Sequence, residues 1–234
     1  YFSTSTPIGE VNGVDSLNTI TFKGSPSVND TVGSLVLEGA SYVTLEDMYI
    51  RGTGGHTIRL NGTDHVTITG CTIEAPLSTS STNIPITCSA SPTSYSMFTG
   101  GEEYLTITNN TITGGYSAHA MYGSSLNLGA HHDITISDNE FSGQYYYGLY
   151  IYYARDVEIE GNTIGGFTNT YNYAAYLYQI DGCKFSGNDV ESYYSILAYY
   201  LNKTSAANVD SEISNNMFKN GYYGMRMYYG ANVG

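Results

Sequence analysis

The residues best suited to chemistry lie in a short charged segment that recurs along the chain. Asp133 follows the pair His131–His132 in "AHHDITIS", and Arg155–Asp156 hold the same place in "ARDVEIE". Two carboxylates beside an arginine could act as acid and base on a glycosidic linkage, or bind a cation. The same residues also suit a solvated turn with an Arg–Asp pair across strands, which contributes little to stability. We interpret the segment as such a turn and keep Asp133, Arg155 and Asp156 as the catalytic alternative.

The sequence gives no pattern typical of a metal or cofactor site. His131 and His132 are adjacent, and neighbouring residues of a strand point to opposite sides, so they rarely bind one ion together. No Cys-x-x-Cys pair is present among Cys71, Cys88 and Cys183. We interpret the cysteines as free structural thiols, with a Cys71–Cys88 disulfide as the alternative that an oxidising compartment would permit. We expect neither a metal nor a cofactor.

A second candidate for chemistry is the density of tyrosine. The chain has 25 tyrosines among 234 residues, and residues 145–153, "YYYGLYIYY", contain six of them. Such phenols could form a surface that binds a ligand, or they could be the packing of a repetitive scaffold. The choice depends on whether the segment recurs.

The elements that position these residues are repeats of one strand motif, apolar-x-apolar-x-x-Asn-x-apolar. Alternation of apolar and polar residues rich in Val, Ile and Thr is typical of strands, and recurrence at 23 to 39 residues is typical of a solenoid. Asn at the sixth place suits a bend, and stacked asparagines can bond one another along the axis. The copies are 43–50, 66–73, 105–112, 134–141, 157–164, 183–190 and 211–218, and the asparagines are Asn110, Asn139, Asn162, Asn188 and Asn216.

A further strand precedes the motif in most repeats. Its expected inward pairs are Ile58/Leu60, Leu126/Leu128, Leu149/Ile151, Ala175/Leu177, Ile196/Ala198 and Met225/Met227. Each coil then has three short strands, and helical periodicity is absent. The segment 76–101, rich in Ser, Thr and Pro, is interpreted as a surface loop that interrupts the repeats.

Strand, turn and "VxIxxNxIxG" resemble the right-handed parallel β-helix of the pectate-lyase-like superfold. The resemblance covers roughly residues 35–234 and implies an all-β solenoid of about seven to eight coils over 36–234, with an irregular start and a partial first coil in 1–35. The stretch "GASYVTLEDMYIRGTGGHTIRLNGTDHVTITGCTIEA" also resembles large surface proteins exported by the type IX secretion system. This second resemblance implies an extracellular or cell-surface location. The fold hosts lyases, hydrolases and adhesins, so it does not determine the chemistry.

Alignment of the coils places the tyrosines in register on the outward positions of the preceding strand. We expect ligand contact at six of them, which are Tyr150, Tyr152, Tyr176, Tyr178, Tyr199 and Tyr228. In the earlier coils we expect Arg59, Asn61, Asn127 and Gly129 at these positions, so the strip begins near residue 145. β-Helical polysaccharide lyases and hydrolases typically bind substrate on this strand. No expected outward position carries the carboxylate that they need.

The composition restricts the partners. A formal net charge of −13 with only 8 basic residues disfavours nucleic acid, whose phosphates require Lys and Arg. No apolar run approaches the ~20 residues that span a bilayer. We expect a non-catalytic adhesin or stalk module, a fragment of a longer chain that continues beyond Gly234. Its partner is a polysaccharide or another surface or secretion protein. The alternative is a polysaccharide lyase or glycoside hydrolase.

Overall fold

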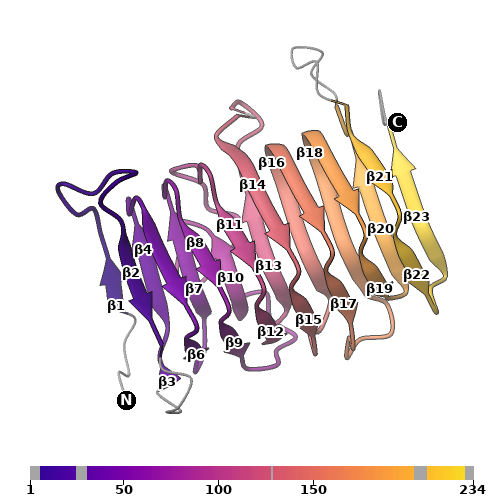
Figure 1. The fold of residues 1–234 in the computed structure, drawn as a ribbon. Helices are drawn as coiled ribbons and strands as arrows, with labels where there is room; N and C mark the ends of the chain where they lie inside the picture. Colours follow the sequence, from indigo (N-terminus) through magenta and orange to yellow (C-terminus); the bar gives the residue numbers. More distant parts are fainter. Residues whose placement is uncertain (1–5, 25–30, 128, 203–209, 230–234) are drawn as a thin grey trace.

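The computed structural model describes residues 6–24, 31–127, 129–202 and 210–229. In this part of the chain every regular element is a β-strand, and the strands wind into a solenoid with β1 at one end and β23 at the other (Figure 1). All strand pairings between named strands are parallel, and they build one 15-stranded and one 8-stranded sheet. The smaller sheet has one strand per coil, so the described residues form eight coils and begin a ninth. The predicted all-β parallel β-helix is confirmed.

Each coil contributes strands to three faces. The first face contains β1 (Thr6–Ile8), β4 (Leu35–Glu38), β7 (His56–Asn61), β10 (Ile84–Cys88), β13 (Ser117–Tyr122), β20 (Tyr194–Tyr199) and β23 (Tyr223–Tyr228). The second contains β2 (Ile20–Lys23), β5 (Val43–Glu46), β8 (Thr67–Thr69), β11 (Thr106–Thr108), β14 (His131–Ser137) and β21 (Glu212–Ser214). The long strands β16 (Tyr147–Glu160) and β18 (Tyr173–Ser186) run through both faces. The third contains β3 (Thr31–Val32), β6 (Tyr49–Arg51), β9 (Thr72–Ala75), β12 (Thr111–Gly114), β15 (Glu140–Ser142), β17 (Thr163–Gly165), β19 (Asp189–Glu191) and β22 (Met217–Lys219).

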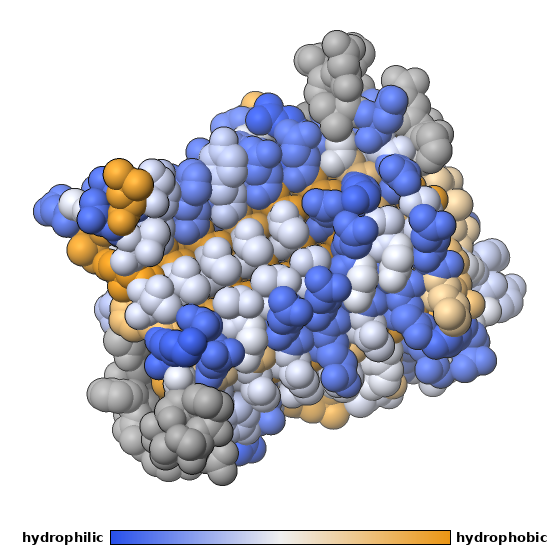
Figure 2. All heavy atoms as spheres, viewed as in Figure 1, coloured by the Kyte–Doolittle hydropathy of each residue, from blue (hydrophilic) through white to orange (hydrophobic). Residues whose placement is uncertain are grey.

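Equivalent residues of successive coils stack in columns, because every coil pairs with the next in the same register. One inward column of the first face is Leu35, Ile58, Ile86, His119, Leu149, Ala175, Ile196 and Met225. Most of its members are fully buried and apolar, so the core is a stack of like side chains along the axis. Figure 2 shows comparable rows as bands of like colour along the visible face.

The inward pair expected at Leu126 and Leu128 is wrong. The strand of that coil is β13, whose residues His119 and Met121 are buried in register with Leu149 and Ile151. Leu126 lies in the following turn and is 97% exposed, and Leu128 lies outside the described residues. The segment "SLNL" has the apolar alternation typical of a strand, whereas "SAHAMY" has a histidine at an inward position. The sequence pattern therefore favoured the wrong segment.

We expected the segment 76–101 to be a surface loop, but it also contributes a strand to the solenoid. It contains β10, all five residues of which are buried, and β10 pairs with β7 on one side and β13 on the other. The coil therefore has its full first-face strand, and the excursion from the solenoid is confined to the residues on either side of it.

The asparagines form a continuous ladder along one corner of the solenoid. The Oδ1 atom of Asn162 accepts hydrogen bonds from the backbone N–H and the side-chain Nδ2 of Asn139, at 2.9 and 3.0 Å. The same two bonds link Asn110 to Asn139, Asn162 to Asn188 and Asn188 to Asn216. At each bend, the side-chain oxygen of an asparagine accepts a hydrogen bond from a buried backbone N–H. The neighbouring strands offer no acceptor for this N–H.

Cys71 continues this ladder where the motif lacks asparagine. Its backbone N–H donates to Asn110 Oδ1 at 2.8 Å, and its Sγ lies 3.5 Å from the Met48 amide nitrogen. Cys71, Cys88 and Cys183 are all free and buried, so the prediction of structural thiols is confirmed. Burial raises the pKa of each thiol, which keeps all three in the neutral form.

The N-terminal region supplies strands to all three faces. In the stretch 1–35, β1 pairs with β4, β2 with β5 and β3 with β6. The boundary drawn at residue 35 stays a prediction.

Candidate functional site

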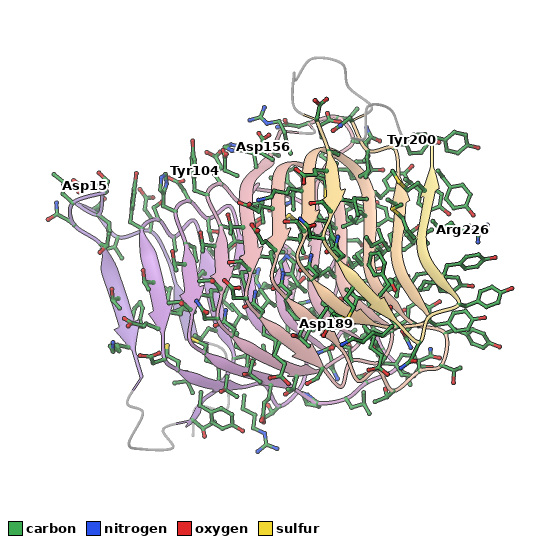
Figure 3. The ribbon with its side chains drawn as sticks, turned by 45° about the vertical axis from the view of Figure 1, so that its right-hand side comes forward. Asp15, Tyr104, Asp156, Asp189, Tyr200 and Arg226 are labelled. Atoms are coloured by element: carbon green, nitrogen blue, oxygen red, sulfur yellow. The ribbon has the colours of Figure 1, made fainter. Side chains whose placement is uncertain are left out.

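The outward residues of the first face carry tyrosine in several columns, in the predicted register. Tyr152 pairs with Tyr178, and Tyr199 with Tyr228. We name the following set the tyrosine face: Tyr122, Tyr147, Tyr150, Tyr152, Tyr153, Tyr173, Tyr176, Tyr178, Tyr194, Tyr199, Tyr200, Tyr223, Tyr228 and Tyr229. In Figure 3 its last coils project to the right, where Arg226 is labelled.

Most rings of the tyrosine face stack against their neighbours along the axis. Tyr152 lies between Tyr122 and Tyr178, with centroids 5.1 and 4.7 Å away and interplanar angles of 19° and 11°. Tyr194 lies likewise between Tyr173, at 4.6 Å, and Tyr223, at 5.6 Å. Both faces of these rings are therefore covered by other rings. A sugar cannot lie flat on them, and the ring edges with their hydroxyls remain for contact.

The packing raises the pKa of several phenols of the tyrosine face. Burial, followed by the neighbouring phenols, raises the pKa of Tyr173 to about 12. Burial is also the largest cause that raises the pKa values of Tyr147, Tyr150 and Tyr176, and Tyr150 and Tyr176 have a further contribution from hydrogen bonds to Tyr152. A neutral phenol hydroxyl both donates and accepts a hydrogen bond, so the face can contact the hydroxyls of a carbohydrate.

The tyrosine face extends one coil further toward the N-terminus than expected. We had placed Asn127 and Gly129 on the outward positions of that coil, but they follow β13 and are not part of it. Tyr122 stands in register with Tyr152. Alignment of "SAHAMY" with "YGLYIY" places Tyr122 at the position of Tyr152, but it also places His119 at the inward position of Leu149, where the pattern calls for an apolar residue.

The excursion after β10 covers the first face in the earlier coils. The Arg59 guanidinium donates hydrogen bonds of 3.1 Å to the carbonyl oxygens of Ser89 and Ala90. The outward residue Thr87 is fully buried, and the ring of Tyr95 packs edge-on against Tyr150 at 5.2 Å. This excursion therefore closes the N-terminal side of the tyrosine face and occupies the sheet surface next to it.

Toward the last coil, other side chains replace tyrosine in one column. Leu197 and Arg226 follow Tyr150 and Tyr176. The Arg226 guanidinium lies 4.8 Å from the ring centroid of Tyr228 and 5.5 Å from that of Tyr223. These distances are typical of cation–π contacts, so the arginine is held by the rings beside it.

The charged turn lies at a different edge of the solenoid. Asp133 and Asp156 hold equivalent positions of adjacent coils, and both have positive φ, 55° and 52°. Arg155 Nε donates to Asp156 Oδ2 at 2.9 Å, and His132 Nδ1 lies 2.8 Å from Asp133 Oδ2. Figure 3 shows Asp156 near Tyr104 on the upper edge, away from Arg226.

An open groove of about 430 Å³ beside this turn is lined by Asp133, Asp156, Glu158 and Lys184, among others. Lys184 Nζ contacts Glu158 at 2.6 Å and Glu160 at 3.0 Å, and the hydrogen bond to Glu158 is the largest cause that raises the pKa of Lys184. The register brings the predicted acids together, but each has a charged or histidine partner already. The arrangement is that of surface ion pairs.

A pair of ionisable residues that sequence reasoning missed is buried inside the solenoid. Glu102 and His131 are fully buried, with Oε2 and Nδ1 2.7 Å apart, and Phe98 packs edge-on against His131. Gly62 N–H donates to Glu102 Oε1 at 3.1 Å. His131 Nδ1 accepts a hydrogen bond from the Glu102 backbone N–H at 3.0 Å, while Glu102 Oε2 and His131 Nε2 have no hydrogen-bond partner among the described residues. Because both side chains are fully buried, we give the pair no role in ligand contact.

Within the described residues, no three His, Cys, Asp or Glu side chains gather in a way that could hold a metal ion. The same part of the chain has no helix with the length and apolarity needed to cross a membrane.

Comparison with known families agrees with this geometry. Residues 96–234, more than half of the chain, match the family described as the right handed beta helix region. The chain belongs to this right-handed β-helix family. The matched residues include the whole tyrosine face and the whole charged turn, so both candidate sites lie on β-helix coils.

Among solved structures, this β-helix is similar to an alginate lyase from Paenibacillus sp. str. FPU-7. The two chains share 11% identity with a TM-score of 0.36, over 94% of this chain and 81% of the lyase. No curated protein matches the β-helix in sequence.

Proposed function

We propose that this β-helix is a non-catalytic module of a secreted or cell-surface protein, an adhesin or stalk that binds polysaccharide through the tyrosine face. The observation that carries the proposal is the continuous array of half-buried tyrosines on the outside of the first face. Neutral phenols combine apolar ring edges with hydroxyls, which suits the mixed C–H and O–H surface of a sugar. Tyr150, Tyr152, Tyr176, Tyr178, Tyr199 and Tyr228 are the proposed contact residues.

The side chains around these tyrosines support binding over catalysis. The other outward residues in the two central columns of this area are Ala120, Leu197 and Arg226. Hydrolysis of a glycosidic bond uses a pair of carboxylates, and elimination uses a base beside groups that neutralise the substrate carboxylate. Neither set is present at these positions.

The alternative function is a polysaccharide lyase or glycoside hydrolase. It rests on Asp133 and Asp156, which line the open groove beside the charged turn, and on Arg155, which donates a hydrogen bond to Asp156. Against it stands the pairing of each carboxylate with a neighbour, Asp133 with His132 and Asp156 with Arg155, as in surface ion pairs.

An array of polysaccharides and oligosaccharides, read for both binding and product, tests the proposal. We expect binding without cleavage, lost in the Tyr152→Ser/Tyr178→Ser variant and kept in Tyr104→Ser. Tyr104 is an exposed tyrosine on the edge with the charged turn, and it controls for loss of a phenol elsewhere. Cleavage of any array member that depends on Asp156 would refute the proposal and favour the alternative.

A further inference from the structure

Resting on the proposed function, we propose a ligand class for the tyrosine face: neutral, ribbon-like polysaccharide chains packed side by side, as in crystalline cellulose or chitin. The face would bind several neighbouring chains of an insoluble surface together and would bind one dissolved chain poorly. The flatness, the size and the charge of the face each point to this class.

In the part of the chain that the structure describes, the tyrosine face shows no groove that could enclose a single chain. The space between Tyr95, Tyr116, Tyr147 and Tyr150 has no room for a water molecule. The rings of Tyr152 and Tyr178 lie 4.7 Å apart and nearly parallel, so nothing enters between them. Proteins that bind one small or flexible chain usually bury most of it in a concave site. A surface of closely packed ring edges can instead be complementary only to another flat surface.

The size of the face matches several chains rather than one. Along a strand, Tyr147 to Tyr152 is five residue steps, which corresponds to about 17 Å, and the chain bends at Tyr153, whose φ is 58°. Along the axis, Tyr122 to Tyr228 is four coil steps, which corresponds to about 19 Å. A single sugar chain laid along the axis would contact one or two columns of hydroxyls and leave the others in water. Chains packed side by side would contact all of them.

The repeat along the axis provides the regularity that a crystalline surface needs. Ring centroids in the column Tyr122, Tyr152, Tyr178, Tyr199 and Tyr228 are separated by 5.1, 4.7, 5.9 and 4.6 Å. These steps are close to the length of one sugar residue in an extended chain. Each coil can therefore offer a hydroxyl to each successive sugar.

Charge favours a neutral polymer. The chain carries a formal net charge of −13. Among the described residues, the cation within the face is Arg226, which is held against Tyr223 and Tyr228. A polyanionic polysaccharide would be repelled at long range by the net charge of the chain, whereas an uncharged chain has no such penalty.

The test compares three forms of the same sugar: crystalline particles of cellulose and of chitin, the same polymers after swelling to an amorphous form, and soluble oligosaccharides. We expect retention on crystalline cellulose or chitin, weaker retention on the swollen polymer, and no heat of binding with oligosaccharides. Replacing Tyr152 and Tyr178 by Phe keeps the stacked rings and removes two hydroxyls. This variant should bind the crystalline polymer roughly tenfold more weakly. Tyr104→Phe, outside the face, should bind like the unchanged protein.

The outcomes separate this inference from the proposed function. Equal binding to oligosaccharides and particles would overturn the ligand class and leave polysaccharide binding intact. Binding to a different, charged polysaccharide would do the same. Absence of binding to every carbohydrate would overturn both. Undiminished binding by the Tyr152→Phe/Tyr178→Phe variant would show that the hydroxyls do not make the contact.

Discussion

Tyr152 and Tyr178, equivalent residues of adjacent coils, stack with their ring centroids 4.7 Å apart and their planes 11° apart. The same two residues are the central members of the proposed contact surface. A ring in this position stabilises the sheet with its faces and presents its hydroxyl edge to solvent. The structural and the binding interpretations of the tyrosines therefore use different parts of one side chain, and substitutions can separate them.

The first prediction separates stacking from the hydroxyl. Tyr152→Ala removes the stacked contacts with Tyr122 and Tyr178, and should lower the free energy of unfolding by about 0.5–1.5 kcal/mol for each contact, beyond the lost burial. Tyr152→Phe keeps both stacks and loses the hydroxyl that bonds Tyr150 and Tyr176, so it should be destabilised less than Tyr152→Ala. Chemical denaturation of the two variants measures the difference. Equal destabilisation by Ala and Phe would show that the hydroxyl, and not stacking, stabilises the coil.

The second prediction concerns the asparagine ladder. In Asn162→Ala, the Asn139 backbone N–H loses its acceptor and the Ile136 carbonyl loses the donor that reaches it at 2.8 Å. Each buried group left unpaired should cost about 1–3 kcal/mol. The comparison is Thr135→Ala, an outward position of β14 whose side chain makes no ladder contact. If the two variants unfold at the same denaturant concentration, the ladder does not stabilise the fold as we argue.

The third prediction is a loss of stability in alkali. The pKa of Tyr173 rises from 10 to about 12 in the folded chain, mainly through burial. The unfolded chain therefore releases this proton first, and the stabilising contribution is full below pH 10 and falls as the pH rises toward 12. Phenolate absorbance should show that the packed phenols Tyr147, Tyr150, Tyr173 and Tyr176, whose pKa values are raised, do not ionise before unfolding. Full ionisation of the native protein near pH 10 would contradict the packing described here.

The fourth prediction is a loss of stability in acid. Burial lowers the pKa of His119 from 6.5 to about 4, so the unfolded chain binds a proton before the folded chain does. Stability is then lost as the pH falls from about 6.5 toward 4, by up to about 3 kcal/mol for this residue. His119→Leu, which matches Leu149 in the same column, should remove that part of the pH dependence. Unfolding curves at several acidic pH values test this, and an unchanged pH profile would refute the assignment.

The fifth prediction addresses catalysis. Asp156→Asn keeps a residue that tolerates the positive φ and removes the ion pair with Arg155. We expect a change in unfolding free energy of at most about 1 kcal/mol and unchanged retention on polysaccharide. Products should be sought with the unchanged protein, with and without added Ca²⁺, by absorbance of unsaturated sugars and by reducing ends. Products that disappear in Asp156→Asn would support the lyase or hydrolase.

Much of the fold could be predicted because every coil of the β-helix repeats the same alternation of inward apolar and outward polar residues. The "VxIxxN" strands, their asparagines and the register of Tyr152 with Tyr178 all follow from alternation at a fixed spacing. The strand β10 was hidden because its proline and the serine-rich sequence around it suit a loop equally well. At β13 the buried His119 broke the apolar pattern, and the exposed Leu126 supplied a false one.

The candidate site was predictable in its residues but not in its chemistry. Register shows that Tyr152 and Tyr178 are neighbours, yet it does not show whether their rings face each other or the solvent. Ring orientation depends on side-chain rotamers and on the crowding of adjacent columns, which a linear pattern does not encode. The contact of Tyr95 with Tyr150 joins residues of different columns and had no periodic signal.

Because every coil pairs with the next in the same register, the coils of the solenoid are structurally equivalent units. Tyr150 and Tyr176 occupy the same position one coil apart, so the chain leaving either residue follows the same local path. Joining residue 149 directly to residue 176 would delete one coil and place Tyr122 next to Tyr178. The tyrosine face would become shorter along the axis, and every column would keep its register. By gaining or losing whole coils, proteins of this kind could fit the length of their binding surface to the target. Such a change would need no new side-chain packing.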